Sequence, residues 1–226
     1  MRDSSLRFFA SRAGIITVGA VIGLLAALLQ KWGNPPNMGI CVACFERDIA
    51  GALGWHRAGV VQYLRPEIPG FVLGSFVAAA LFGEFKSRTG SAPIARFFLG
   101  IFAMIGALAF LGCPWRALLR LAGGDLNAIV GLVGLTAGIA GGVAFLRQGY
   151  SLGRSHRNKP VGWLMPAFMG LLALLALVHS GLLFYSEKGP GAMFAPVLIS
   201  LGAGLVIGFL AQRTRFCTMG SVRDII

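Results

Sequence analysis

Residues 41–49 read Cys41-Val-Ala-Cys-Phe-Glu-Arg-Asp-Ile49, and residues 217–225 read Cys217-Thr-Met-Gly-Ser-Val-Arg-Asp-Ile225. Each stretch is a cysteine, five residues and then Arg-Asp-Ile, and the two cysteines are 217 − 41 = 176 positions apart. Each stretch follows a long apolar run. Thiols and opposite charges at membrane depth are costly and have few structural uses. We therefore interpret the signature as the mark of an internal repeat with a function.

The apolar runs around the signature define the class of protein. The chain is 56% hydrophobic and 12% charged, whereas soluble domains average about 25% charged residues. Six runs approach the roughly 20 residues that span a bilayer as a helix, and glycine lies inside them, as close helix packing in lipid allows. We predict an all-α, polytopic protein of the cell (inner) membrane, with spans at 13–29, 69–82, 96–111, 128–146, 163–185 and 194–210.

The net charge of +12 does not indicate nucleic-acid binding, because the basic residues lie at the ends of the apolar runs. Such clusters follow the positive-inside rule. With the N-terminus in the cytoplasm, the basic regions 2–12, 86–96 and 147–159 all fall inside, and the turn at Lys188 falls outside. Residues 31–68 do not fit, since they would lie outside and yet hold four basic residues: Lys31, Arg47, Arg57 and Arg65.

Counting spans predicts the relation between the two signatures. Five spans separate them, and because five is odd the two repeats would run in opposite directions through the membrane. Inverted repeats are typical of transporters, with the substrate site at their interface. We predict a first repeat with connecting helices over 1–192 and the start of a second repeat over 193–226. We expect the second repeat to be incomplete, with three interpretations: the sequence is truncated, the second half is missing, or two copies of the chain assemble as a homodimer.

Three segments are too short or too polar to span a membrane and too apolar for ordinary loops. They cover residues 34–53, 112–125 and 215–226. We predict that each is a half helix re-entering the membrane from one face, which is tolerated where protein or water surrounds the backbone.

Gly112-Cys-Pro-Trp-Arg116 is the sharpest local pattern. Proline favours the first turn of a helix, which would place Cys113 at or beside the N-cap. The free amides there attract anions and favour a thiolate, and Arg116 adds a positive charge. An anion or thiolate site is one interpretation, and a packed structural cysteine is the other.

The adjacent Arg and Asp of each signature need partners elsewhere in the chain, because neighbours in sequence do not face each other on a helix. We predict that Arg47 pairs with Asp224 and that Asp48 pairs with Arg223, across the repeats. The alternative is that the charges snorkel to the membrane interface.

Cys41-x-x-Cys44 is also compatible with a redox dithiol or a disulfide. A metal site is not expected, because the chain has three histidines (His56, His156 and His179) and no second Cys-x-x-Cys. The second signature has Gly220 where the first has Cys44, so the feature common to both is one thiol.

His179, alone in an apolar run, is interpreted as a packing residue.

These motifs resemble the YeeE/YedE family of membrane proteins, the thiosulfate-transporter family, over most of the chain. The resemblance rests on Gly112-Cys-Pro-Trp-Arg116, on 215–224 and on 37–48, the last being most similar to a branch described as selenium transporters of the YedE type. It implies inverted halves whose short helices line a central path. It also implies that the thiols of Cys41, Cys113 and Cys217 pass the ion by S–H hydrogen bonds, with Cys44 as an extra thiol.

We therefore expect a transporter, rather than an enzyme, for a small sulfur- or selenium-containing species. Cys41, Cys44, Cys113, Cys217 and Arg116 are the expected substrate-binding residues, and no cofactor is expected. One alternative is a membrane thiol oxidoreductase that uses Cys41 and Cys44. The other is a membrane component that hands sulfur or selenium to a cytoplasmic partner of the sulfurtransferase type.

Overall fold

A computed structural model describes residues 8–110, 112–158 and 160–226 of the chain. Within these ranges the protein is mostly helical, and five helical segments are long and apolar enough to cross a membrane: Arg12–Lys31, Pro93–Ala122, Asn127–Arg147, Val161–Val178 and Val197–Ile225. The chain divides into two compact units. Unit 1 comprises 8–40, Phe45–Phe85 and Trp163–Phe216, and unit 2 comprises Cys41–Cys44, Lys86–Gly162 and Cys217–Ile226.

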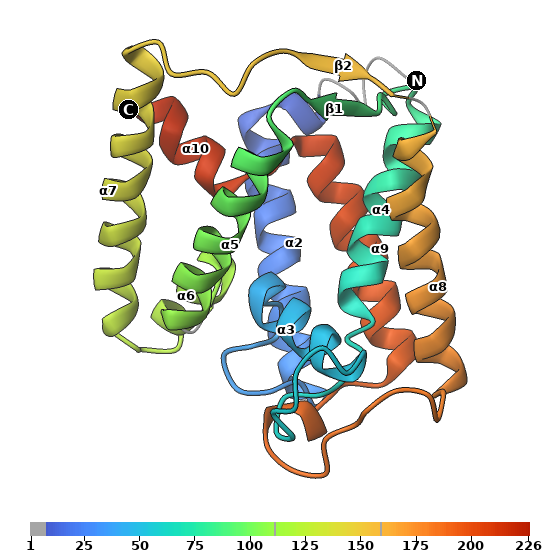
Figure 1. Ribbon diagram of the computed structural model, residues 1–226. Coiled ribbons are helices and arrows are strands. Elements are labelled where there is room, and N and C mark those ends of the chain that lie inside the picture. The colour runs from blue at the N-terminus through green and yellow to red at the C-terminus, as the bar shows by residue number, and fades with distance from the viewer. Residues whose placement is uncertain (1–7, 111, 159) are drawn as a thin grey trace. The chain divides into compact units, whose positions relative to one another are not determined.

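Unit 1 is a bundle in which α4 packs against α9 and α8, and α2 packs against α9 (Figure 1). Its helices coincide with four of the predicted spans, although α4 is a shorter apolar helix than the rest. The elements of this unit are α2 (Arg12–Lys31), α3 (Val42–Ala52, whose first turn belongs to unit 2), α4 (Glu67–Leu81), α8 (Leu164–Val178), the 3₁₀ turn Pro190–Ala192 and α9 (Val197–Thr214). A further 3₁₀ turn, Val161–Trp163, leads into α8.

Glycines allow α4 and α9 to approach each other closely. Gly70 and Gly74 lie one helical turn apart on α4, and Gly204 and Gly208 do the same on α9. A Cβ atom at any of the four would collide with a backbone carbonyl of the facing helix. Small residues four apart are the usual means by which helices pack tightly in a bilayer. This helix pair therefore forms the centre of unit 1.

Unit 2 contains long helices that bury little of their apolar surface. No residue of α5 is buried, and Ala128 is the buried residue of α7. Exposed apolar helices of this length are what lipid contact requires. The elements of the unit are β1 (Arg88–Gly90), α5 (Pro93–Ala109), α6 (Pro114–Ala122), α7 (Asn127–Arg147), β2 (Ser155–Arg157) and α10 (Thr218–Ile225).

The expectation of an all-α chain is wrong in one detail. Strands β1 and β2 pair antiparallel in unit 2, with Arg88 opposite Arg157. The ladder joins two of the three basic regions that we predicted to lie on the same side of the membrane. The pattern of basic residues gave no signal for it, because three-residue strands are too short to show an alternation.

One predicted span is shorter than expected. Helix α8 ends at Val178 instead of Tyr185, because His179 adopts the left-handed conformation with φ 48°. A non-glycine residue in this region terminates the helix at a small conformational cost. The His179 ring stacks on Tyr185, with the ring centroids 4.3 Å apart, which agrees with the interpretation of His179 as a packing residue.

The three segments predicted as half helices each contain a short helix. Helices α3, α6 and α10 have 11, 9 and 8 residues. A motif cysteine directly precedes each of them: Cys41, Cys113 and Cys217. Their entry into the membrane and the inverted arrangement of the repeats remain predictions.

Candidate functional site

The starts of α3 and α6 meet at the sulfur of Cys113, within unit 2. Cys113 is the N-cap of α6, with an extended backbone (φ −77°, ψ 171°) and Pro114 at the first helical position, as the sequence predicts. Backbone amides at the start of both helices, those of Val42, Ala43 and Arg116, interact with its sulfur. Unpaired amides at a helix start carry partial positive charge. Two such helix starts therefore create a local environment that favours negative charge.

The two helix starts contact each other through two pairs of residues that have the same spacing along the chain. The sulfur atoms of Cys113 and Cys41 form a thiol–thiol hydrogen bond of 3.8 Å. The Arg116 Nη1 donates to the Cys44 sulfur at 3.1 Å. Both contacts join positions 72 apart in the chain (113 − 41 and 116 − 44). We name these four residues the thiol–guanidinium cluster: Cys41, Cys44, Cys113 and Arg116.

The three thiols of the thiol–guanidinium cluster are shielded from solvent, and its arginine has an unused donor. Cys41 and Cys44 are fully buried, and Cys113 is 8% exposed. The Nε atom of Arg116 is buried and has no hydrogen-bond partner among the described residues. Buried polar groups in native proteins are nearly always paired, and each exception needs an explanation. An acceptor supplied by a ligand would explain this one.

Cys113 also lines a pocket of about 390 Å³. The pocket walls are mainly apolar, formed by α5, α6 and α7 together with Met219 of α10, and include Gly131 and Leu135. A larger groove of about 900 Å³ shares Leu135 and Met219 with this pocket and reaches Cys217 and Arg223. Within unit 2, the pocket at Cys113 and the groove at Cys217 are therefore adjacent.

Cys217 differs from the cysteines of the cluster in its surroundings. It is exposed and is the N-cap of α10, where its sulfur accepts a hydrogen bond from the Gly220 amide at 3.3 Å. The structure thus brings together four of the five predicted substrate-binding residues and places the fifth on the adjoining groove. The sequence did not predict the contact between Cys44 and Arg116, because Cys44 had no counterpart in the second signature.

The Arg-Asp pairs are formed locally, so our expectation that neighbours in sequence do not pair is wrong. Arg47 Nη2 lies 2.7 Å from Asp48 Oδ1, and Arg223 Nη2 lies 2.7 Å from Asp224 Oδ1. The arginine side chain is long enough to fold back onto the adjacent carboxylate, which the rule of helical spacing neglects. Each of these charges has a local partner, which removes the electrostatic reason for the predicted pairs across the repeats.

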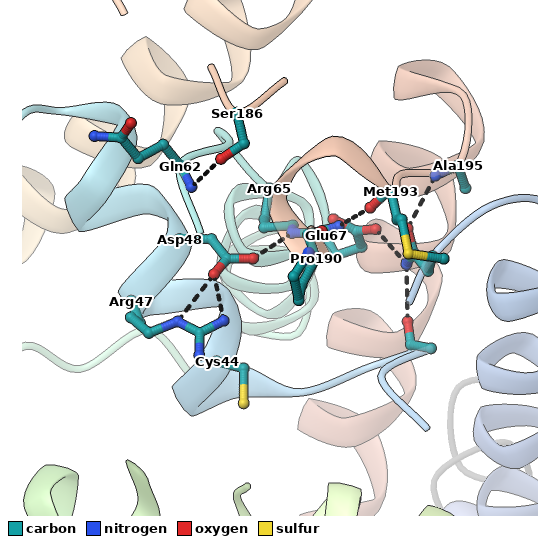
Figure 2. Close-up of polar contacts among 12 residues, drawn as sticks. Cys44, Arg47, Asp48, Gln62, Arg65, Glu67, Ser186, Pro190, Met193 and Ala195 are labelled. Atoms are coloured by element: carbon teal, nitrogen blue, oxygen red, sulfur yellow. Dashed lines mark hydrogen bonds and ion pairs between the residues drawn. The ribbon is translucent and has the colours of Figure 1, made fainter. Parts of the chain in front are cut away.

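Arg65 is a buried residue of unit 1 that lies within 31–68, the residues that did not fit the positive-inside rule. Its Nε donates to Asp48 Oδ2 at 2.9 Å, and its two terminal nitrogens donate to the carbonyls of Met193 and Pro190 at 2.9 and 2.7 Å. Figure 2 shows Arg65 between Asp48 and the segment that carries these carbonyls. The sequence did hold one signal for the burial of Arg65, namely the surplus of basic residues in 31–68. A paired and buried arginine does not count toward the positive-inside rule, so its burial accounts for part of that surplus.

A second buried network adjoins Arg65 in unit 1 (Figure 2). Asn34 donates to Glu67 Oε1 at 2.8 Å and to the carbonyl of Gly39 at 3.1 Å, and its side-chain oxygen accepts from the Ala195 amide at 2.9 Å. Burial, followed by the nearby charge of Glu67, raises the pKa of Tyr63, which keeps that hydroxyl protonated. The network connects the segment before α9 to the start of α4.

An ion pair lies at the other end of α4 and α9. Arg213 Nη1 lies 3.1 Å from Glu84 Oε1. Desolvation alone would raise the pKa of Glu84, but hydrogen bonds from Arg213 and Gln212 outweigh it and lower that pKa. The carboxylate is therefore ionised at neutral pH and holds the end of α9.

No protein-family model, no curated protein and no solved structure matches the chain. In the part of the chain that the structure describes, no three His, Cys, Asp or Glu side chains are grouped so as to hold a metal ion. The fold and the site thus define a helical protein with several segments able to cross a membrane and a buried cluster of thiols around a guanidinium group.

Proposed function

We propose that this chain is a membrane transport protein for a small sulfur- or selenium-containing anion, and that the anion binds at the thiol–guanidinium cluster. The observation that carries the proposal is the unpaired, buried Nε of Arg116 beside three thiols. A charged donor without an acceptor, next to two helix starts, favours an anionic ligand.

The chemistry of the cluster favours one class of anion. A guanidinium group binds the oxygens of an oxyanion through a planar pair of N–H groups. Thiols are soft and suit soft atoms such as sulfur and selenium better than hydroxyls would. An ion with both kinds of atom, such as thiosulfate, can use Arg116 and the thiols together. Sulfate has oxygens alone and would bind less well.

The adjoining groove supports a path that continues to Cys217. A substrate that leaves Cys113 would enter the pocket of about 390 Å³ and then the groove at Cys217. We further propose that the chain belongs to the YeeE/YedE family and that its N-terminus is cytoplasmic. In that orientation Cys217 lies at the cytoplasmic end, where a protein of the sulfurtransferase type could receive the substrate.

The test is uptake of labelled thiosulfate, selenite and selenide by proteoliposomes that contain the purified chain. Uptake should be lost in Cys41→Ala, Cys113→Ala and Cys217→Ala. Thr136→Ala is the matched control, because its hydroxyl donates only to a carbonyl of its own helix, at 2.9 Å. Uptake that is unchanged in all three cysteine variants would reject the relay of thiols. Absence of uptake of every substrate by the folded wild type would reject transport.

A further inference from the structure

We propose that Cys41 and Cys113 form a site of reversible oxidation, at which a peroxide converts the two thiols into a disulfide between the starts of α3 and α6. The chemical step is independent of what the protein transports. Its consequence for transport rests on the function proposed above.

The geometry of the two thiols carries this proposal. Their sulfur atoms are 3.8 Å apart and already joined by a hydrogen bond. A disulfide bond is about 2.05 Å long, so the sulfurs would need to approach by only roughly 1.8 Å. The residues are 72 positions apart (113 − 41), so the bond would connect two separate segments of unit 2.

A small oxidant has a route to one of the two sulfurs. Cys113 lines the pocket of about 390 Å³, whereas Cys41 is completely buried. A peroxide that enters the pocket would therefore meet Cys113 first. Cys41 is then in place to react with the product before a second oxidant molecule arrives.

The other cysteines have partners besides Cys41 and Cys113. The Cys44 sulfur also interacts with Cys41, but it accepts a hydrogen bond from Arg116 Nη1 at 3.1 Å, and this contact directs it toward the guanidinium. The Cys217 sulfur accepts from the amide of Gly220 within α10. The contacts therefore favour Cys41 with Cys113 over the Cys41-x-x-Cys44 pair that the sequence suggests.

The reaction balances in two steps. The Cys113 sulfur attacks one oxygen of hydrogen peroxide, which gives a sulfenic acid and one water. The Cys41 sulfur then attacks the sulfenic sulfur, which forms the S–S bond and releases a second water. Two thiols lose two electrons and peroxide gains them. A dithiol reductant reverses the change by thiol–disulfide exchange.

Oxidation would remove two thiols from the proposed substrate path. The bonded sulfurs no longer have S–H groups to donate to a substrate. We therefore expect the oxidised protein to be closed to transport and the reduced protein to be open. A protein that handles reactive sulfur or selenium species would in this way respond to oxidising conditions.

The experiment treats the full chain in membranes with hydrogen peroxide, alkylates the remaining thiols and digests the protein without reduction. In the wild type, mass spectrometry should detect a cross-link between the peptides that contain Cys41 and Cys113. Cys44→Ser and Cys217→Ser should keep this cross-link, because neither sulfur takes part. Cys41→Ser and Cys113→Ser should lose it. These four variants share one substitution and are matched controls for each other.

Two results would overturn the proposal. One is a bond between Cys41 and Cys44, and the other is a cross-link to Cys113 that persists in Cys41→Ser. Uptake by the same membranes separates this proposal from the proposed function. Uptake that falls with peroxide and returns with dithiothreitol supports both. A cross-link in a protein that transports none of the labelled substrates would leave the oxidation site standing and reject the transport function.

Discussion

Two arginines with buried side-chain nitrogens, Arg65 in unit 1 and Arg116 in unit 2, have opposite surroundings. All three nitrogen positions of Arg65 donate, one to the Asp48 carboxylate and two to backbone carbonyls. Arg116 has a thiol for Nη1 and no partner for Nε among the described residues. The first arrangement is complete without a ligand, and the second is not. Arg213 also has a buried Nε without a partner, but its guanidinium already pairs with the Glu84 carboxylate, whereas the guanidinium of Arg116 faces a thiol.

The same contrast extends to helix packing within each unit. In unit 1 the glycines of α4 and α9 contact the facing backbone. In unit 2 the equally spaced glycines of α7, Gly134 and Gly138, have no atom within 4 Å of where a Cβ would lie. Unit 1 is closely packed and unit 2 keeps open volume beside its cysteines.

The largest expected effect is the loss of Arg65. Arg65→Ala leaves Asp48 buried with Arg47 as its remaining partner and removes the donors of two carbonyls. Removing one partner of a buried pair costs about 3–5 kcal/mol, so we expect severe destabilisation. The measurement is denaturant unfolding in detergent, with Arg57→Ala as the control, because Arg57 is exposed and stacks on Phe184. Equal stability of the two variants would contradict a structural role for Arg65.

An intermediate effect is expected at the glycines. Gly74→Ala places a methyl group against the carbonyl of Leu205, and overpacking of this kind costs about 1–3 kcal/mol. Gly138→Ala is the matched substitution on α7, where it meets open space and should stabilise the helix by up to about 1 kcal/mol. Thermal unfolding of the two variants compares them. A destabilised Gly138→Ala would show that α7 is closely packed after all.

The smallest effect is the pH dependence of the pair between Glu84 and Arg213. The pKa of Glu84 is lowered in the folded protein, so its contribution is present at neutral pH and lost as the pH falls below the ordinary glutamate pKa of 4.5. The side chain is 33% exposed, and such pairs contribute at most about 1 kcal/mol. Glu84→Gln should lower stability at neutral pH and converge with the wild type in acid. A difference in stability between the wild type and Glu84→Gln that stays constant with pH would contradict an ionised Glu84 paired with Arg213.

Much of the fold was predictable from the sequence. The apolar runs predicted the helices α2, α5, α7, α8 and α9 and the shorter α4, since length and hydropathy determine them, and proline at 114 predicted the N-cap at Cys113. The end of α8 was not predictable, because the apolar pattern carries no signal for a left-handed conformation at a non-glycine residue such as His179. Strands β1 and β2 were too short to give a pattern.

The site was only partly predictable. The cysteines and Arg116 were identified from motifs, but which of them meet depends on how the helix starts pack, and spacing does not reveal that. The contact between Arg116 and Cys44 and the buried position of Arg65 are examples. The pairing of Arg47 with Asp48 was missed because the spacing rule considers where side chains start and neglects how far arginine reaches.

The most direct test of the binding site is the affinity of the purified chain for thiosulfate, measured by calorimetry in the wild type, Arg116→Met and Arg120→Met. Arg120 lies one turn further along the same helix and already pairs with Asp125 at 2.7 Å, so it controls for the loss of a charge. A charged hydrogen bond contributes about 1.5–3 kcal/mol, roughly tenfold to a hundredfold in affinity. We predict this decrease in thiosulfate affinity for Arg116→Met and not for Arg120→Met, with the free energy of unfolding of Arg116→Met equal to that of the wild type. Equal thiosulfate affinity in the wild type and Arg116→Met would contradict an anion site at the thiol–guanidinium cluster.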